Sequence, residues 1–476
     1  MNRLLQVVLG WLLIVLVILC NNIFSQVLIP SSNHLEHFTN YYSFYNKSFF
    51  NGLNDGPVNI LPGDKLPSYD GFFVLDSINT HTNSIVSLPH GNKLAWLNTA
   101  SNISGKIRTN LFYSVGLIVS NSSNQQFEIG TNKTKYGLTG RINNAWVLYR
   151  KKKVELLIGR IAYKWGPGVF SSLYLNGELP QYDQIGVKFR FSPEFQVHSF
   201  TSKLPTIYDG NNSMINRFLS GHRVKWNIND KMVFGFGDII LYSGLNRDLN
   251  FAYSNPFIPY FASIYEGGNE SATNDDNMLI FFELLWQYTS YTRFYSEFII
   301  DDFQVDIKDR AKIDDALGIT LGHTLNIPIN KKVDLNTQIE YTVLNTWVYN
   351  HSGLLSSYTY KDRPIGNQEG GDVEELHIRT DLWKNRKLSF GLQYDYVAKG
   401  EITPTEPWRA YETKHADFPL GTVQYANRYT LDFYWYTKKY RYVKPYITYE
   451  AIQNLNHELH NDDTSWDYGV EMYWWI

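Results

Sequence analysis

Hydrophobic and polar residues alternate strictly in many short segments of this chain. In residues 185–191, Ile, Val and Phe occupy the odd positions, and Gly, Lys and Arg occupy the even ones. Residues 333–343, 388–396 and 429–436 repeat this pattern. A period of two places successive side chains on opposite faces of a β-strand. These segments therefore predict strands with one apolar and one polar face.

The length and the ends of these segments favour a membrane barrel over a sandwich in water, although alternation alone fits both. The segments are about 9 to 13 residues long, which suits a tilted strand that crosses a bilayer. Their apolar faces commonly end in Tyr, Trp or Phe, as in an aromatic girdle. Roughly 16 such segments lie between Lys106 and Ile476, which is typical of a large barrel. The sequence therefore predicts an all-β fold, a transmembrane antiparallel β-barrel of about 16–18 strands.

The end of the chain fits this prediction. Tyr468, Val470, Met472, Trp474 and Ile476 alternate with mostly polar or small residues and predict a final strand. Lipid offers no hydrogen bonds, so every backbone group must be paired within the protein, and a closed barrel achieves this.

The first 25 residues have the order of a secretory signal peptide. A positive charge at Arg3 precedes the apolar run 4–20, and small and polar residues follow it. We expect cleavage after Ser25; a membrane anchor is the alternative, because the run is near the lower length limit for a transmembrane helix. Cleavage would remove Cys20, the one cysteine in the sequence, so disulfides cannot stabilise the mature chain.

Residues 26–105 contain several prolines and show little periodicity. We expect a periplasmic extension, a plug or the first strands of the barrel in this segment, and the barrel itself at residues 106–476. Polar stretches rich in Gly and Asn at residues 267–277 and 352–372 predict loops on the outer face.

The composition supports a membrane protein. Aromatic residues make up 16% of the 476 residues, with 35 Tyr and 13 Trp, whereas charged residues make up only 19%. Tyr and Trp are favoured where one end of a side chain is apolar and the other is wet. The net charge of −3 and the lack of a basic tract give no reason to expect a nucleic acid partner.

An unusual turn follows the strand-like segment 154–163. The sequence KWGPGVFSSLYLN begins at Lys164, and its Gly-Pro-Gly tripeptide ends the strand, since Pro has no backbone donor and Gly permits unusual dihedrals. In a barrel we expect Trp165 at the membrane interface, where the tripeptide turns the chain. The alternative is a turn that folds inward to shape the pore, where Tyr163 and Trp165 would offer their faces to a sugar.

Several motifs resemble one known family. IGRIAYKWGPG…SLYLNGELPQYDQI is similar to a region of the capsule-assembly Wzi-like outer-membrane proteins, and RFLSGHRVKWNINDKMVFGFGDIILYSG, YSNPFIPYF and NMLIFFELLW…FYSEFIIDDFQVD follow in the expected order. The motifs cover about residues 140–306, and the remainder is similar only in its barrel pattern. The motif residues to which we assign a structural role are Gly159, Arg160, Gly166, Pro167, Gly168, Asn255, Pro256 and Pro259.

This resemblance implies a barrel in the outer membrane of a Gram-negative-type envelope. It implies binding of surface polysaccharide, a role in the assembly or attachment of a capsule or exopolysaccharide, and no catalysis. Better-known members have a helical region that plugs the periplasmic mouth. Residues 26–105 show no clear helical pattern.

Charged residues fall on the polar faces of the predicted strands. A salt-bridged barrel interior would explain them; the alternative is that the cations gather on one wall and meet the acidic sugars of a capsule. The candidate polysaccharide-binding residues are Tyr163, Trp165, Lys188, Arg190, Arg223, Lys225 and Arg379. The acidic residues on the same faces are Glu340, Asp381, Asp395 and Asp432.

Signals of catalysis are weak. The sequence has no Gly-x-Ser-x-Gly elbow, phosphate-binding loop or Cys/His metal spacing. His222 could be part of a catalytic or metal pair with Arg223, but a single His on a strand is more often a hydrogen-bonded structural residue. Asp301 and Asp302 resemble a metal or acid pair, but adjacent strand residues point to opposite faces, so the two carboxylates cannot easily cooperate unless the strand has ended. We expect no enzyme activity, no cofactor and no metal site.

Two functions remain open from the sequence. The first is a polysaccharide-binding barrel that does not conduct. The second is an outer-membrane porin or transporter for small solutes such as sugars or fatty acids. In either case we expect a monomer that contacts outer-membrane lipid, and in the first its partner is a surface polysaccharide.

Overall fold

The structure is a computed structural model. It describes residues 74–87, 96–120, 139–177, 179–208, 212–264, 274–303, 315–351, 354–385, 387–406, 417–438 and 441–475. The signal peptide expected at residues 1–25 lies outside the described residues.

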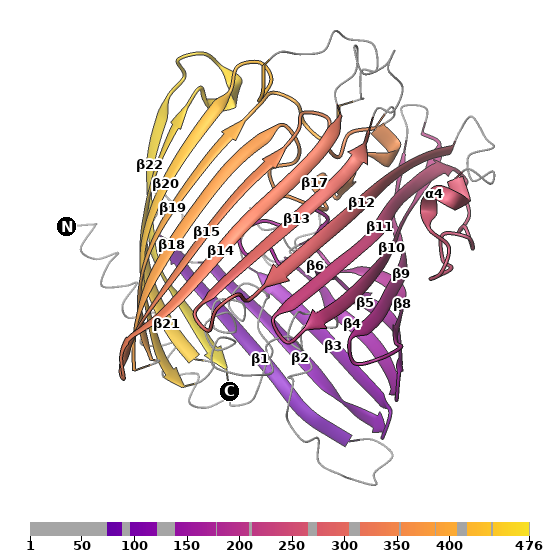
Figure 1. The fold of residues 1–476 in the computed structure, drawn as a ribbon, viewed down its shortest axis with the longest axis horizontal. Coiled ribbons are helices and arrows are strands. Elements are labelled where there is room, and N and C mark those ends of the chain that lie inside the picture. Colours follow the sequence, from indigo (N-terminus) through magenta and orange to yellow (C-terminus); the bar gives the residue numbers. More distant parts are fainter. Residues whose placement is uncertain are drawn as a thin grey trace.

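Eighteen long strands form one antiparallel sheet (Figure 1). They are β1 (Val74–Ser87), β2 (Trp96–Arg108), β3 (Leu111–Ser120), β4 (Thr139–Lys151), β5 (Val154–Ile161), β8 (Tyr182–Arg190), β9 (Phe195–Tyr208), β10 (Met214–Asn229), β11 (Met232–Leu245), β12 (Asn274–Trp286), β13 (Thr292–Asp302), β14 (Ala316–Asn330), β15 (Val333–Leu344), β18 (Val373–Lys384), β19 (Leu388–Lys399), β20 (Gln424–Lys438), β21 (Arg441–Gln453) and β22 (Asp463–Trp475). The barrel predicted from the alternation is confirmed, and its strand number is at the upper end of the predicted range.

The sheet closes on itself. Each strand pairs with the strand before it and the strand after it, and the last strand returns to the first. In this closing pair, residues 81–87 of β1 lie opposite residues 469–475 of β22. Closure removes the free edges that would otherwise leave backbone groups unpaired in lipid.

The two ends of the barrel differ in the length of their connections. At one end dipeptides join strands, as at residues 109–110, 152–153 and 331–332. At the other end the connections are long, as at residues 162–181 and 345–372. Because β1 begins and β22 ends at the short-turn end, this end corresponds to the periplasmic side of outer-membrane barrels, and the long-loop end corresponds to the outside.

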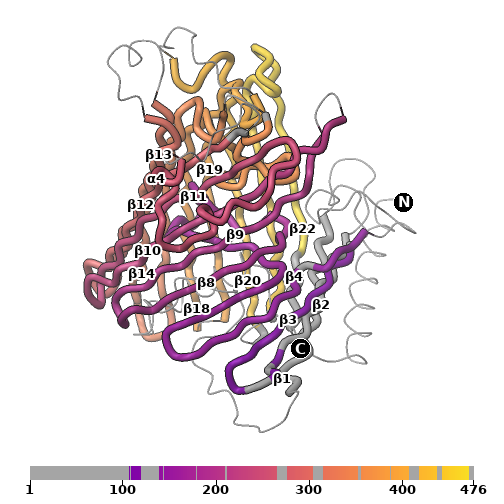
Figure 2. The backbone as a smooth tube through the Cα atoms, turned by 90° about the vertical axis from the view of Figure 1, so that its right-hand side faces the viewer, coloured from indigo at the N-terminus to yellow at the C-terminus, as the bar shows by residue number. Residues whose placement is uncertain are grey.

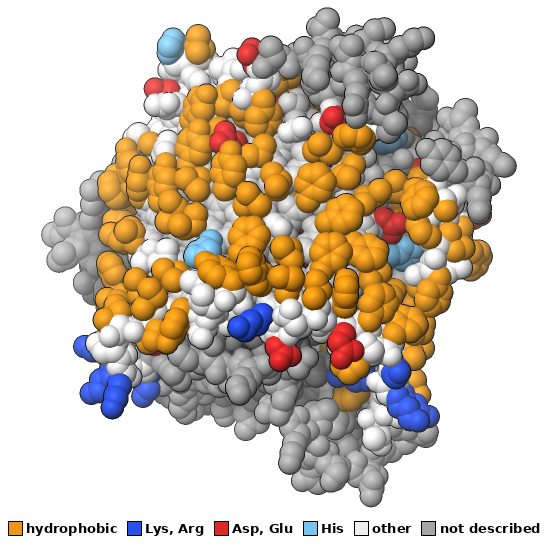
Figure 3. All heavy atoms as spheres, in the orientation of Figure 1, with side chains coloured by type: hydrophobic (Ala, Val, Ile, Leu, Met, Phe, Trp, Pro, Cys, Tyr) orange, Lys and Arg blue, Asp and Glu red, His pale blue; other side chains and the backbone are white. Residues whose placement is uncertain are grey.

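Burial on the strands is inverted relative to a soluble protein. On β15, Ile339 is 41% exposed while the neighbouring Glu340 is fully buried. On β8, Ile185 is 61% exposed while Lys188 is 7% exposed. Figure 3 shows the consequence, a band of apolar side chains across the strands with Lys and Arg gathered below it. Such an outer face suits hydrocarbon, so the barrel spans a membrane.

The first two strands come from the N-terminal segment. β1 and most of β2 lie within residues 26–105, so this part of the segment contributes to the barrel wall. Among the described residues, no helix is long and apolar enough to cross a membrane. The short helix α4 (Tyr260–Ser263) lies beside β10 and β11 (Figure 2).

Candidate functional site

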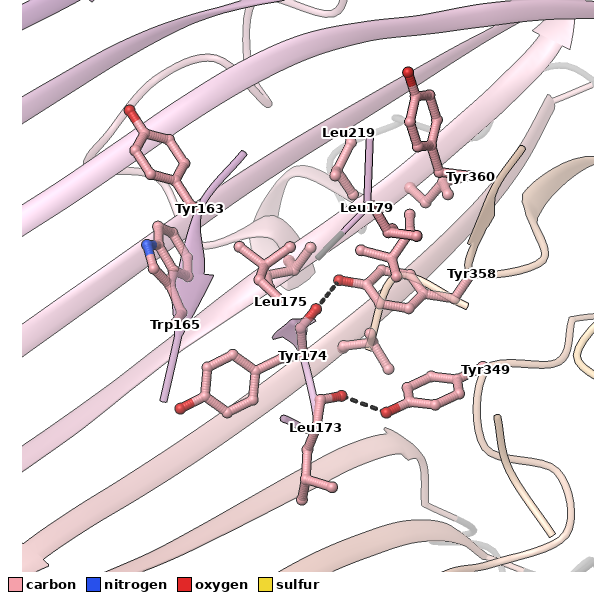
Figure 4. Packing of buried hydrophobic residues seen from close by; sticks show 14 of the residues in the cluster. Tyr163, Trp165, Leu173, Tyr174, Leu175, Leu179, Leu219, Tyr349, Tyr358 and Tyr360 are labelled. Atoms are coloured by element: carbon pink, nitrogen blue, oxygen red, sulfur yellow. Dashed lines mark hydrogen bonds between the residues drawn. The ribbon is translucent and has the colours of Figure 1, made fainter. Parts of the chain in front are cut away.

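The connection between β5 and β8, residues 162–181, folds into the barrel; we call it the inner loop. It contains the short strands β6 (Lys164–Trp165) and β7 (Leu175–Asn176), which pair with each other. Trp165, Leu173 and Tyr174 are completely buried there (Figure 4). The expectation that Trp165 lies at the membrane interface is therefore wrong, and the turn folds inward as in the alternative. The contact of Tyr163 and Trp165 with a sugar stays a prediction.

Buried carboxylates on distant strands hold the inner loop. Glu297 of β13 accepts hydrogen bonds from the backbone N–H groups of Gly168 (2.6 Å) and Leu173 (2.8 Å). Glu340 of β15 accepts from the backbone N–H groups of Val169 (2.6 Å) and Ser171 (2.7 Å). In the strand order β15 is nearly opposite β5. The inner loop therefore crosses the lumen, because its backbone donors find their acceptors on the far wall.

The Gly-Pro-Gly tripeptide makes this close approach possible. Gly166 has φ of +107°, and a Cβ there would lie within 3.0 Å of the Glu297 carboxylate. A Cβ on Gly168 would lie within 3.0 Å of the Ser171 carbonyl oxygen and of Glu297. Both positions therefore require glycine, which explains the strand-ending motif that stands out in the sequence.

Trp165 anchors the inner loop against the wall. Its ring centroid lies 5.3 Å from those of His198 and Phe200, and 5.9 Å from that of Phe281. The Arg223 guanidinium lies 5.9 Å from the same ring and bonds to the Glu283 carboxylate at 2.5 Å. Trp165 thus joins an aromatic and ionic cluster and presents no free face to a ligand in this conformation.

Burial raises the pKa of both tyrosines of the inner loop. The pKa of Tyr174 is raised well above its usual value, first by burial and then by the negative charges of Glu283 and Glu297. Its hydroxyl donates to Glu283 at 2.5 Å. The pKa of Tyr163 is also raised, mainly by burial and to a smaller extent by Glu155.

The connection between β15 and β18, residues 345–372, also folds inward; we call it the second inner loop. It contains η3 (Leu354–Ser356), β16 (Thr359–Tyr360) and β17 (Arg363–Pro364). The Tyr349 hydroxyl donates to the Leu173 carbonyl (2.5 Å), and the Tyr358 hydroxyl donates to the Tyr174 carbonyl (2.6 Å), as Figure 4 shows. The two inner loops therefore form one body inside the barrel.

The structure refines the two loop predictions. Residues 352–372 belong to a connection at the long-loop end, as predicted, but its described part folds into the lumen, where Ser356 and Tyr358 are fully buried. The prediction for residues 267–277 is wrong in its last four residues, which begin β12, and residues 267–273 lie outside the described residues.

The cations singled out by the sequence line a salt-bridged interior. Arg379 bonds to Asp381 and Asp432 at 2.7 and 2.9 Å. The Arg190 side chain, 51% exposed, bonds to Glu155. The other candidates, Lys188, Arg223 and Lys225, are at most 7% exposed.

Only part of this set is brought together. Lys188 and Arg223 both lie opposite His198 in the strand register, and Lys225 lies two residues further along β10. Arg379 stands apart on β18. With the inner loop in place, a sugar could reach the buried members only after the loop moved, so their role in binding stays a prediction.

The structural motif residues occupy constrained positions. Gly159 has φ of +139°, and a Cβ there would meet the backbone of Ala145. Arg160 forms an ion pair with Asp183 at 2.6 Å. The Asn255 side chain accepts from the Phe257 N–H at 3.1 Å, Pro256 lies between them, and Pro259 precedes α4.

His222 has the structural role that its isolation in the sequence suggests. Its Nδ1 lies 2.9 Å from the Asp238 carboxylate, and its ring stacks on Tyr260 at 4.2 Å. Asp301 accepts from the Tyr349 N–H at 2.5 Å. In the part of the chain that the structure describes, no group of three or more His, Cys, Asp or Glu side chains could hold a metal ion.

A small pocket lies in the rim at the long-loop end, where the pairing of β12 with β13 stops at Ile280 and Ile300. This rim pocket has a volume of about 260 Å³. Its lining is Asp276, Asn277, Met278, Asp301, Asp302, Ala316, Trp347, Asn350 and His351. No local pattern in the sequence predicts this pocket, because its residues come from segments far apart in the chain.

The sequence analysis also does not identify Glu283 and Glu297 as acceptors of hydrogen bonds from the inner loop. The alternation predicts that both residues lie on the polar faces of β12 and β13. It does not predict which residues they bond to, because those partners lie in the inner loop.

Comparison with known proteins decides the family. A family model for the capsule assembly protein Wzi matches residues 93–465. The chain belongs to the Wzi family. A search of curated proteins returns no match.

Solved structures support the Wzi fold. The Escherichia coli outer membrane protein Wzi, described as involved in group 1 capsule assembly and as a carbohydrate-binding β-barrel, is 13% identical with a TM-score of 0.61, over 95% of this chain and 100% of that chain. OccK10 (OpdN) of Pseudomonas aeruginosa is 8% identical with a TM-score of 0.46, over 84% of this chain and 99% of that chain. OpdK of the same organism is 12% identical with a TM-score of 0.45, over 85% and 98%. Likeness at these two lower scores carries no argument about function.

Proposed function

We propose that this Wzi-family protein binds surface polysaccharide at the long-loop end of its barrel. It would thereby assist the assembly or attachment of a capsule or exopolysaccharide, without catalysing a reaction. The observation that carries the proposal is the pair of inner loops in the lumen. An open barrel of about 18 strands leaves an aqueous channel, whereas here two buried loops cross it, which suits binding better than transport.

The rim pocket is the first contact that we propose for a sugar unit. The carboxylates of Asp301 and Asp302 and the amides of Asn277 and Asn350 offer acceptors to sugar hydroxyls. Trp347 adds an apolar wall to this lining. A pocket of this kind holds one sugar unit weakly, and many copies of the protein on one polymer would turn weak contacts into retention.

This arrangement favours a contact that depends little on salt. The candidate cations Arg223 and Arg379 are already bonded to carboxylates inside the barrel. Hydrogen bonds from sugar hydroxyls in the rim pocket are screened far less by salt than exposed ion pairs are.

We also propose a monomer, because a closed sheet leaves no strand edge for a second copy.

Binding of purified protein to polysaccharide tests the proposal. Full-length protein in detergent is immobilised, and polysaccharide from the producing cells is passed over it at low and high salt. The variants Asp302→Asn and His351→Ala change the rim pocket. Glu458→Gln is the matched control, because Glu458 is an exposed carboxylate at the same end, in the connection between β21 and β22.

We expect binding by the native protein and the control, and several-fold weaker binding by the two rim variants. Equal binding by all four proteins would show that the polysaccharide binds elsewhere than in the rim pocket. No binding by any of them, together with large conductance in planar bilayers, would favour the porin alternative.

A further inference from the structure

The long connection after β11 folds outward rather than inward. Residues 246–264, which we call the outer flap, leave the end of β11 and lie against the outside of the wall, with α4 at their end (Figures 1 and 2). The backbone N–H of Tyr260 donates to the Asp238 carboxylate at 2.8 Å. The Thr201 hydroxyl donates to Ser254 of the flap at 3.4 Å.

The strand register shows that these wall residues face outward. Ile158 of β5 lies opposite Ile185 of β8, which lies opposite Thr201 of β9. Residues opposite each other share a face of the sheet. Ile158 and Ile185 are 62% and 61% exposed and belong to the lipid-facing band. The outer flap therefore covers part of the surface that the membrane surrounds.

The outer flap is built to lie near lipid. Its backbone makes internal turns, with hydrogen bonds from Ser254 N to the Phe251 carbonyl (3.2 Å) and from Ser263 N to the Pro259 carbonyl (3.3 Å). Phe251 is 82% exposed and Phe257 is 63% exposed. Internally paired backbone and outward phenylalanines suit the boundary between water and acyl chains.

Between the outer flap and the wall lies a groove of about 850 Å³, within the range of about 300–1,000 Å³ that is usual for ligand sites. Ile158, Ile185 and Val187 line its wall side, and Leu249 and Phe251 line its flap side. The groove is therefore apolar over much of its length and open to the hydrocarbon that surrounds the barrel.

The polar groups of the groove lie toward the long-loop end. β8 runs from that end at Tyr182, so Asp183 lies nearer the outside than Ile185 does. Asp183 forms an ion pair with Arg160. Lys203 is exposed on the neighbouring strand β9, and its amine lies 5.9 Å from the centroid of the Phe218 ring. The flap adds Asp248 to the lining. The groove thus has a charged outer part and an apolar inner part, as an outer-leaflet lipid does.

We propose that this groove binds one phosphate-bearing lipid of the outer leaflet. An acyl chain lies along Ile185 and Val187 under the outer flap, and the headgroup phosphate accepts a hydrogen bond from the Lys203 amine. This groove lies on the outside of the wall, whereas the inner loops lie in the lumen, so lipid binding can be measured without polysaccharide.

Lipid retention by the purified full-length protein tests the proposal. The protein is incubated in detergent with phosphatidylglycerol, with a diacylglycerol of the same chains, or with inorganic phosphate, and retained lipid is counted by native mass spectrometry. Ile185→Trp fills the groove, and Lys203→Ala removes the amine. Ile339→Trp is the matched control, an equally apolar lipid-facing position on β15 away from the flap.

We expect one phosphatidylglycerol on the native protein and on the control, and loss of both lipids in Ile185→Trp. Lys203→Ala should lower phosphatidylglycerol retention about tenfold, to the level of diacylglycerol, as expected for one charge-assisted hydrogen bond. If Ile185→Trp does not fold, as judged by heat-modifiable gel migration, Val187→Trp replaces it. Equal retention in groove-filling and control variants would overturn the proposal. Retention of inorganic phosphate equal to that of phosphatidylglycerol would also overturn it, because it would indicate a simple anion site.

Discussion

Replacing Glu340 with Gln should release the inner loop and leave the barrel intact. In the native protein the two carboxylate oxygens accept from the N–H groups of Val169 and Ser171, from the Ser171 hydroxyl (2.9 Å) and from the Tyr295 hydroxyl (2.6 Å). A glutamine keeps one acceptor oxygen and presents an NH₂ group where the other was. About half of these hydrogen bonds would be lost. The NH₂ group of the glutamine would then face N–H and O–H groups that also donate.

The magnitude follows from the number of bonds lost. Three of the four bonds come from the inner loop, and one or two of these are lost, depending on which oxygen the NH₂ group replaces. A hydrogen bond to a charged group contributes about 1.5–3 kcal/mol, so loop docking is weakened by about 1.5–6 kcal/mol. The strand ladders of β14, β15 and β18 do not involve this side chain, so the barrel should assemble normally.

Planar bilayer recordings and limited proteolysis measure the effect. We expect Glu340→Gln to raise conductance and to expose the inner loop to protease, with native heat-modifiable migration on a gel. Glu374→Gln is the control, because Glu374 lies on the adjacent β18 and bonds to the exposed Tyr341 hydroxyl instead of the inner loop. Native conductance and native protease resistance in Glu340→Gln would refute the view that this carboxylate holds the loop.

Three further outcomes are expected. Gly168→Ala should undock the inner loop without impairing barrel assembly, since its Cβ would meet the Ser171 carbonyl; impaired assembly would show that the turn guides barrel folding. Ile339→Arg should destabilise the folded barrel in lipid by up to about 2–4 kcal/mol in urea titrations, because the side chain faces hydrocarbon, and an unchanged midpoint would argue against that face. Asp238→Ala should loosen the outer flap by removing the acceptor of Tyr260 N–H, and trypsin or chymotrypsin cleavage within residues 246–264 should increase; native resistance would contradict this.

The wall of the barrel could be predicted from the sequence because its signal is local. A period of two is written in each strand, so the outward position of Ile339 and the inward position of Glu340 follow from their neighbours. The length of the strands and the aromatic residues at their ends further indicate that the apolar face lies in lipid and not in the core of a soluble sandwich.

The contents of the lumen could not be predicted in the same way. Trp165 has a large apolar ring with a polar atom, which suits both a membrane interface and a buried cluster. The choice depends on Glu297 and Glu340, which lie more than a hundred residues later in the chain and become neighbours only when the barrel closes. The glycines at 166 and 168 indicate a tight backbone position but not the side chains that crowd it.

Retention of polysaccharide by whole cells tests the central claim most directly. The gene is deleted, and cell-bound and released polysaccharide are measured in the deletion strain, its parent and a strain complemented with the native protein. If the protein binds surface polysaccharide, the deletion strain should make normal total amounts but release most of it into the medium, and complementation should restore retention. Equal cell-bound fractions in the deletion strain and its parent would contradict the account.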